Sequence, residues 1–357
     1  MTDDSEILPE AELDARQAEV LRSIIQQHIA CGEPVGSRTV ARIARLELSA
    51  ASIRNIMAEL EERGLLSQPH TSAGRVPTDG AYRVYVRRMI DEPPRVAPSL
   101  AQSIEEALAR NRSEVPEMMG EASRQLSHLS QQVGLVLAPD LRRIIIDRLE
   151  FFQLDGRRVM AILVGRGGMV HQRVVEVAAP LDHRELERIS RHATEQFGGR
   201  TLRQMRKLLR TRLREDRAAL DRLQASSLSL AEQAVTVDTV EAHLFVEGAS
   251  NLLGTSGFSD LDMVRALFKT LEEKETLIGL LSRLLDGHGV QVVIGSENPL
   301  TDRAHCSLVA SSYHGEGGRV MGTVGIVGPT RMPYARVIGL VDYLAAVLTR
   351  LLSSPNN

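Results

Sequence analysis

Residues 49–55, SAASIRN, combine small and hydrogen-bonding side chains whose chemistry suits contact with a polynucleotide. Hydroxyl and amide groups donate to and accept from base edges, and a guanidinium binds phosphate or guanine in a bidentate geometry. The stretch therefore favours a face that enters a DNA groove, and its candidate residues are Ser49, Ala51, Ser52, Arg54 and Asn55.

The surrounding sequence predicts a helix that is capped by Ser49 and stops at Gly64. Serine is a good N-cap residue, and glycine suits the left-handed position that follows a helix. Glu59, Glu61 and Glu62 crowd the last turns, so phosphate is attracted by the first half of the helix and repelled by the second. A helix that enters a major groove N-terminus first has this layout. Apolar residues at helical spacing predict one buried stripe, formed by Ile53, Ile56, Met57 and Leu60.

Two more helices are expected before this one. Asp14 and Gln17 have the spacing of a capping box, which predicts the start of a first helix. Ser37 is expected to cap a second, short helix. Arg38 and Arg42 lie on that short helix, where they can reach the DNA backbone.

The segment after Gly64, LLSQPHTSAGRVP, predicts a strand, a polar tip and a return strand, which together form a wing. His70, Thr71 and Arg75 are the candidates for wing contacts to phosphate or to the minor groove. Gly74 lets the neighbouring backbone approach another surface closely. An ordinary amphipathic helix followed by a surface loop is the alternative, but helix pair, wing and uneven charge together favour DNA.

The wording of this region resembles the N-terminal domain of the HrcA family of heat-inducible transcription repressors. The strings SIRNIMAELEERGLL and PHTSAGRVPT carry most of the likeness. A second block matches independently, with VVIGSEN at 292–298, CSLVASSY at 306–313 and GTVGIVGPTRMPYARVI at 322–338. The sequence departs from the usual family wording at residues 50–52, where a more hydroxyl-rich stretch is expected.

The resemblance implies an α+β multidomain chain. It consists of an N-terminal winged helix-turn-helix and a GAF-like α/β sheet domain that carries a helical inserted dimerisation domain. Strand-like and helical periodicity alone leaves a second arrangement open, with two successive domains. The expected divisions are a winged-helix domain at 1–90, a proline linker with connecting helices at 91–135, a first GAF-like part at 136–198, the insertion at 199–286 and a second GAF-like part at 287–352.

The resemblance also implies the function and the partners. The target is the CIRCE inverted repeat upstream of chaperone operons, and the protein binds this double-stranded DNA as a homodimer. The GroEL chaperonin maintains the active form, which is lost on heat stress. A sensor whose GAF-like domain binds a small molecule is the alternative from another functional class.

Charge is distributed unevenly along the 357 residues, whose net charge is −3. Residues 14–90 hold 11 Arg, no Lys and 8 Asp plus Glu, so this part carries +3 and the remainder −6. A basic domain on an acidic body fits a protein that binds DNA at one end. The absence of a signal sequence and of a long apolar run leads us to expect a cytoplasmic protein without membrane contact.

Other groups of reactive or charged residues do not indicate a further functional site. The two cysteines, Cys31 and Cys306, have no metal or disulfide spacing, and no nucleophile motif is present, so we expect no enzyme, no cofactor and no metal. Residues 200–222 carry nine basic and three acidic side chains around an apolar helical stripe, which favours a solvated face of the insertion over a second DNA surface.

Overall fold

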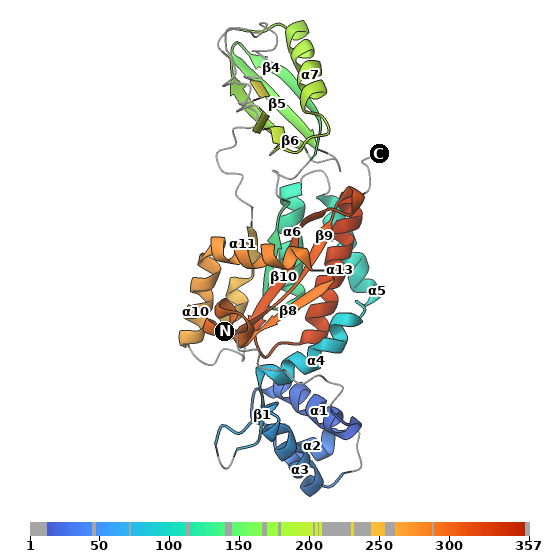
Figure 1. The fold of residues 1–357 in the computed structure, drawn as a ribbon, viewed down its shortest axis with the longest axis vertical. Coiled ribbons are helices and arrows are strands. Elements are labelled where there is room, and N and C mark those ends of the chain that lie inside the picture. Colours follow the sequence, from blue (N-terminus) through green and yellow to red (C-terminus); the bar gives the residue numbers. More distant parts are fainter. Residues whose placement is uncertain are drawn as a thin grey trace.

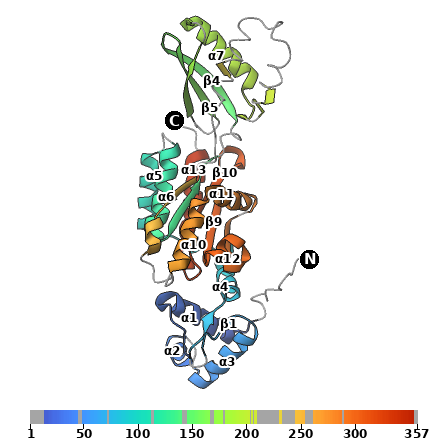
Figure 2. The ribbon, with the colours of Figure 1, turned by 90° about the vertical axis from the view of Figure 1, so that its left-hand side faces the viewer.

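The structure is a computed structural model in which three parts lie one after another along the long axis (Figures 1 and 2). We call them the N-terminal unit (13–91), the body (98–139 with 244–353) and the inserted unit (145–208 with 230–231), each within the described residues. Those described residues are 13–44, 48–70, 73–111, 115–139, 145–165, 170–177, 180–202, 204–205, 207–208, 230–231, 244–253, 261–287 and 289–353.

The N-terminal unit contains α1 (Ala15–Cys31), α2 (Ser37–Ile43), α3 (Ala50–Glu62) and α4 (Asp79–Asp91). Between α3 and α4, β1 (Leu66–Ser67) pairs antiparallel with β2 (Val76–Pro77).

The helix boundaries follow the expected signals with one exception. The Asp14 carboxylate accepts a hydrogen bond from the backbone amide of Gln17 at 2.7 Å. The side-chain oxygen of Gln17 accepts one from the backbone amide of Asp14 at 3.2 Å, so the capping box is confirmed. Ser49 caps α3, and Gly64 takes the left-handed conformation at φ 72°. The prediction that Ser37 caps α2 is wrong. Ser37 is already the first helical residue, and the N-cap is Gly36, which makes no side-chain cap bond.

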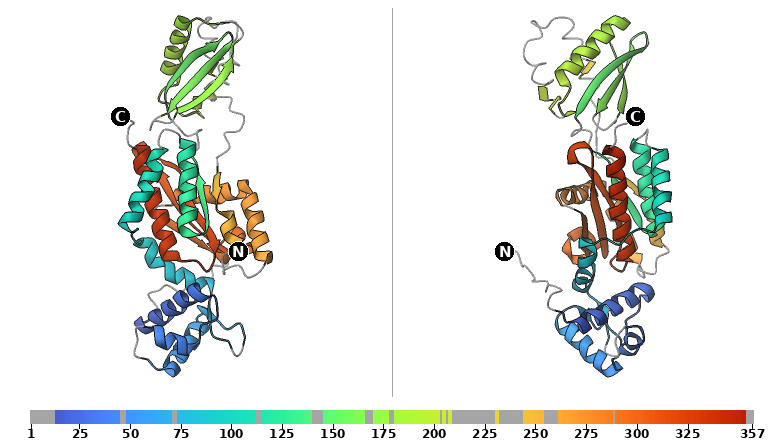
Figure 3. Two further views of the ribbon diagram at one scale, coloured as in Figure 1. Left: turned by 180° about the vertical axis from the view of Figure 1, so that it is seen from behind. Right: turned by 90° about the vertical axis from the view of Figure 1, so that its right-hand side faces the viewer.

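The body is built on a five-stranded antiparallel sheet with strand order β7-β3-β10-β9-β8. Helices cover both faces (Figure 3). α5, α6 and α13 share one hydrophobic cluster with the first face, and α10 and α11 share another with the second. The bounds are β3 (Val133–Leu137), β7 (Leu244–Glu247), β8 (Val290–Ile294), β9 (Cys306–His314), β10 (Val320–Pro329), α5 (Pro98–Arg110), α6 (Val115–Ser130), α10 (Leu261–Glu272), α11 (Lys274–Arg283), α12 (Pro299–Arg303), α13 (Tyr334–Ser353), and the 3₁₀ turns η3 (Ala249–Leu253), η4 (Leu284–Asp286), η5 (Gly295–Glu297) and η6 (Glu316–Gly318).

The inserted unit is a separate three-stranded sheet, β4 (Ile146–Asp155), β5 (Arg158–Gly165) and β6 (Val170–Glu176), covered on one face by α7 (His183–Phe197). It has its own hydrophobic core, which includes Leu149, Phe151, Ile189 and Phe197. Because the sheet and α7 bury their apolar faces against each other, the unit needs no surface of the body to close its core.

This division differs from the expected one in two ways. Of the strands expected from about Val133 onward to begin the main sheet, only β3 joins it. The strands β4, β5 and β6, which lie in the first GAF-like part expected at 136–198, form their own sheet. The helices α10 and α11, expected within a helical insertion at 199–286, pack instead on the main sheet. Periodicity identifies a strand or a helix but not its partner. In the basic segment 200–222, Leu202 and Met205 are buried in the inserted core, and Leu209 and Leu213 lie outside the described residues.

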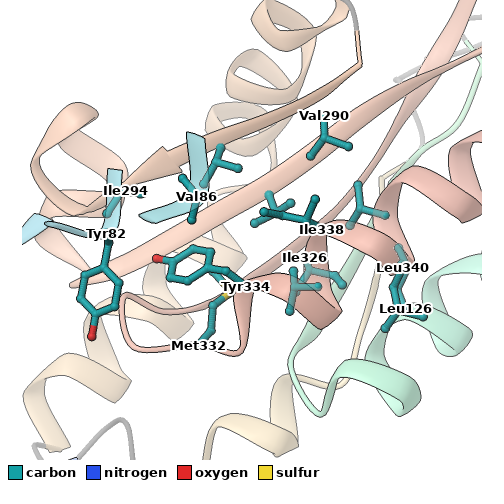
Figure 4. Close-up of a cluster of buried hydrophobic side chains, with 14 of the residues drawn as sticks. Tyr82, Val86, Leu126, Val290, Ile294, Ile326, Met332, Tyr334, Ile338 and Leu340 are labelled. Atoms are coloured by element: carbon teal, nitrogen blue, oxygen red, sulfur yellow. The ribbon is translucent and has the colours of Figure 1, made fainter. Parts of the chain in front are cut away.

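The proline-containing segment 91–99 does not hold the N-terminal unit away from the body as a linker would. One hydrophobic cluster runs from α1 and α3 through α4 into β8 and α13. Figure 4 shows this junction, where Tyr82 and Val86 of α4 meet Met332 and Tyr334. The rings of Tyr82 and Tyr334 lie 5.7 Å apart between centroids.

Candidate nucleic-acid interface

The first turns of α3 present an exposed, mostly polar face. Ala51, Ser52, Arg54 and Asn55 are all exposed, whereas Ile53, Met57 and Leu60 are buried and Ile56 is partly buried. The predicted stripe is thus the face that holds α3 in the unit. The predicted groove face is the one directed outward.

Ser49 has a structural task at this face. Its hydroxyl accepts from the Ser52 amide at 3.1 Å and lies 3.0 Å from the Ser52 hydroxyl. This cap satisfies one of the unpaired amides at the start of the helix. Removal of Ser49 would therefore loosen the turn that displays Ser52, Arg54 and Asn55.

Two of the three carboxylates near the end of α3 are bound within the protein. The Gln17 side-chain amide donates to Glu59 at 2.8 Å, and the Arg75 guanidinium donates to Glu61 at 2.8 Å. The sequence identified these residues only as charges that repel phosphate. Their partners come from α1 and from the wing, and no sequence signal links them.

Arg75 is consequently placed differently from the expectation. Its side chain is only 19% exposed and is directed at Glu61 of α3 rather than outward. This ion pair fixes the base of β2 to α3, so Arg75 positions the wing. His70 is exposed at the tip, and Thr71 lies outside the described residues.

Gly74 permits the close approach that was expected of it, and the surface it approaches belongs to the protein. Val35 and Arg75 exchange backbone hydrogen bonds of 2.8 and 2.9 Å, which adds a third backbone segment to the β1–β2 pair. A Cβ at Gly74 would lie 2.5 Å from the Val35 carbonyl. The segment before α2 and the wing are therefore held together without a side chain between them.

Arg38 and Arg42 are exposed on α2, which packs directly against α3. Two arginines on α2 and one at the start of α3 thus lie on the outer surface of one helix pair. Guanidinium groups in such an arrangement bind phosphate oxygens, while the shorter Ser52 and Asn55 side chains reach base edges.

The described residues show no group of three or more His, Cys, Asp or Glu side chains placed to hold a metal ion. No helix among them has both the length and the apolar character to cross a bilayer.

Comparison with known proteins decides the family. A repressor from Geobacter sulfurreducens named heat-inducible transcription repressor HrcA is 40% identical over 346 residues, which is 96% of this chain and 98% of that protein. This chain belongs to the HrcA family. The profile of the HrcA protein C terminal domain matches residues 116–338.

Other HrcA relatives agree. Proteins with the same name from Xanthomonas euvesicatoria pv. vesicatoria and Syntrophobacter fumaroxidans are 39% and 34% identical, and each alignment covers 96% or more of both chains. A crystal structure titled as a hypothetical protein covers 97% of this chain and 100% of its own, with a TM-score of 0.66 and 24% identity. That likeness concerns the fold alone.

Proposed function

We propose that this HrcA-family chain represses transcription by binding DNA with α3, its N-terminal unit acting as a winged helix. The polarity of α3 carries the proposal. Its exposed first turns offer Ser52, Arg54 and Asn55, whereas Glu59 and Glu61 near its end are occupied by Gln17 and Arg75. The first turns of α3 are thus exposed and free of carboxylates, which suits contact with a polyanion. The activity requires neither catalysis nor a cofactor, and it belongs in the cytoplasm, where the DNA is.

The proposed target is the CIRCE inverted repeat upstream of class I heat-shock operons. A footprint on the chaperone promoters of the source organism tests this, together with mobility shifts on the repeat and on a duplex of the same composition with shuffled arms. Protection confined to both arms of the repeat is the expected result. Equal affinity for the shuffled duplex at physiological salt would contradict it.

Asn55→Ala separates base reading from phosphate contact. Loss of an amide that contacts a base edge should weaken operator binding by about 1–3 kcal/mol and leave binding to random DNA unchanged. Arg54→Ala is the comparison, since a lost phosphate contact weakens both DNAs and makes the salt slope less steep by about one unit. Identical effects of the two variants on random DNA would refute the assigned roles.

The homodimer is proposed to form through the outer face of the inserted sheet. Phe152, Leu154, Val170 and Val174 are 42%, 47%, 60% and 47% exposed, the large exposed apolar residues of the described chain apart from Ile43. Phe152 pairs across the sheet with Met160, and Met160 with Val174, so the apolar surface is continuous from β4 to β6. Contiguous exposed apolar surface is typical of a protein interface.

Phe152→Glu tests this interface. A carboxylate within the apolar face should raise the dimer dissociation constant by two orders of magnitude or more, as about 3 kcal/mol requires. Gln153→Glu is the matched control, because it adds the same charge one residue on, on the opposite face of β4. Sedimentation equilibrium measures both. A Phe152→Glu variant that stays dimeric like the control would rule out this face.

The proposed dependence on the GroEL chaperonin and on heat rests on the split body. β3 must pair with β10 across nearly 200 residues of sequence, and such non-local pairing slows folding and exposes apolar surface meanwhile. Mild heating should lower the fraction of protein that binds the operator, and chaperonin with ATP should raise it. Operator binding that survives heat and ignores chaperonin would disprove this part of the proposal.

A further inference from the structure

Arg331, in the loop before α13, reaches from the body to the end of α1. Its guanidinium donates to the carbonyls of His28 and Ile29 at 3.2 and 3.4 Å. These carbonyls lie in the last turn of the helix, where a cation is favoured. Gly32, left-handed at φ 78°, makes room, since a Cβ there would lie 2.5 Å from the guanidinium. The body thus contributes the guanidinium, and the end of α1 contributes the carbonyls and the space at Gly32.

The first turn of α4 makes two contacts in the other direction. The Asp79 carboxylate accepts from the amide and the hydroxyl of Ser296, each at 3.0 Å. Gly295, at φ 44°, allows this, because a Cβ at that position would collide with the carboxylate.

Arg83, one turn further along α4, donates to Glu297 at 2.6 Å and to the Val292 carbonyl at 2.6 Å. Glu297 in turn accepts from the Ile294 amide at 2.7 Å, which fixes it at the end of β8. The side chains of Arg83 and Glu297 are 23% and 25% exposed, so the ion pair lies at the edge of the junction and is partly screened from solvent.

These three contacts surround an apolar junction that does not itself define an angle. Burial of Tyr82, Val86 and Met332 is favourable for many relative orientations, because the hydrophobic effect is not directional. Hydrogen bonds and bidentate ion pairs, in contrast, require one geometry. The polar contacts therefore select the orientation of α3 with respect to the body.

We propose that Arg331, Asp79 and Arg83 form a latch that positions α3 for the two arms of an inverted repeat. This inference rests on the proposed function. In a dimer joined at the inserted units, two joints connect each α3 to the symmetry axis: the junction held by the latch, and the connection between the body and the inserted unit. The latch fixes the first joint and so narrows the range of separations between the two recognition helices. A rigid link between two binding sites strengthens joint binding at the matching separation and weakens it at others.

The test uses the full-length dimer and three DNA duplexes: the native repeat, the repeat with about 5 base pairs (half a helical turn) added at its centre, and a single arm. Arg331→Ala and Arg83→Ala should each bind the native repeat about tenfold more weakly, bind the single arm unchanged, and lose the wild-type preference for native spacing. Arg336→Ala on α13 and Arg87→Ala on α4 are matched exposed controls and should behave like wild type. Arg331→Lys keeps a cation at the end of α1 and should recover most of the affinity.

A second measurement needs no DNA. Glu62→Cys on α3, in a Cys31→Ser background, accepts a spin label, while the buried Cys306 does not react. The label-to-label distance distribution in the dimer should be narrower with the latch intact than with Arg331→Ala or with the milder Asp79→Asn. Asp79→Asn also serves if Arg331→Ala fails to fold.

The outcomes are distinguishable. Narrow distances in every variant, an unchanged spacing preference, or equal losses on the single arm and the repeat would each overturn the latch. If the wild type binds no operator while the distances still broaden in the variants, the latch stands as a device that orients the N-terminal unit, and the proposed function fails.

Discussion

The N-terminal unit and the inserted unit are attached to the body in opposite ways. The first shares a continuous hydrophobic cluster with the body and adds directional polar contacts to it. The second closes its own core, from which the body's residues are absent among those described. The number of chain connections between a unit and the body therefore does not determine how strongly the two are coupled in stability. The unit at the chain terminus is coupled tightly to the body, and the unit inside the chain is the more independent one.

Tyr334→Ala should break the first attachment and have the largest effect. Tyr334 is fully buried, contacts the Tyr82 ring, and bonds Ser307 at 2.8 Å and the Thr330 carbonyl at 2.7 Å. Its loss leaves a cavity at the junction and should lower the free energy of unfolding by about 3–5 kcal/mol. Denaturant unfolding measures this loss. Hydrogen exchange should show that amides of the N-terminal unit and of the body lose protection together. Unchanged protection in α1 and α3 would mean that the two parts are not coupled.

Leu149→Ala should sharpen the contrast, at a somewhat smaller magnitude. Leu149 is fully buried between β4 and α7, and truncation of such a residue lowers the free energy of unfolding by about 2–5 kcal/mol. Because the inserted core is separate, faster exchange should be confined to the inserted unit. Destabilisation that spreads into α13 would contradict the independence of the inserted unit.

Lowering the pH should have the smallest effect on stability, and it also distinguishes the N-terminal unit and body from the inserted unit. Burial and the nearby Arg331 charge lower the pKa of His28 from 6.5 to about 4, and its ring bonds the Tyr82 hydroxyl at 2.9 Å. Between those two pH values the unfolded chain binds the extra proton, so stability is lost as the pH falls from 6.5 towards 4. The Tm of the N-terminal unit with the body should fall by roughly a few degrees at pH 5.

Two variants separate the parts in that experiment. Burial and Arg173 also lower the pKa of His171, which lies in β6, so the inserted unit loses stability in the same direction. His28→Gln should remove this pH dependence from the N-terminal unit and the body but not from the inserted unit, and His171→Gln should remove it from the inserted unit only. Loss of both dependences with a single variant would show that the cores communicate.

Local features were predictable from the sequence, and partner choices were not. Ser49, Gly64 and the Asp14 capping box act within a few residues, so their spacing suffices to identify them. The pairings of Arg75 with Glu61 and of Gln17 with Glu59 join elements whose contact exists only after folding. The candidate groove face was predictable because it is the reverse of a periodic stripe.

The helix α4 also shows that the sequence predicts an element but not the partners against which it packs. Tyr82 and Val86 face the body, whereas Tyr85 and Met89 border α1 on another side. Both pairs have i, i+4 spacing, so the sequence reveals a helix apolar on two sides and not which domain covers each. The strands of residues 146–176 were likewise recognised as strands and assigned to the wrong sheet, because alternation does not encode the neighbour.

One pairing in the body has a consequence for how this family can change. β3 and β7 are antiparallel neighbours, with Leu137 opposite Leu244, so the chain leaves the sheet and re-enters it at adjacent positions. To the sheet, everything between these two leucines is a hairpin loop, and the entropy of closing such a loop grows only with the logarithm of its length, by about 0.6 kcal/mol per doubling. The segment between β3 and β7 can therefore be exchanged for another without a large change in the stability of the sheet. Recombination at this point would replace the inserted unit by another unit, or by a short turn, while the register of the sheet and the N-terminal unit stay as they are.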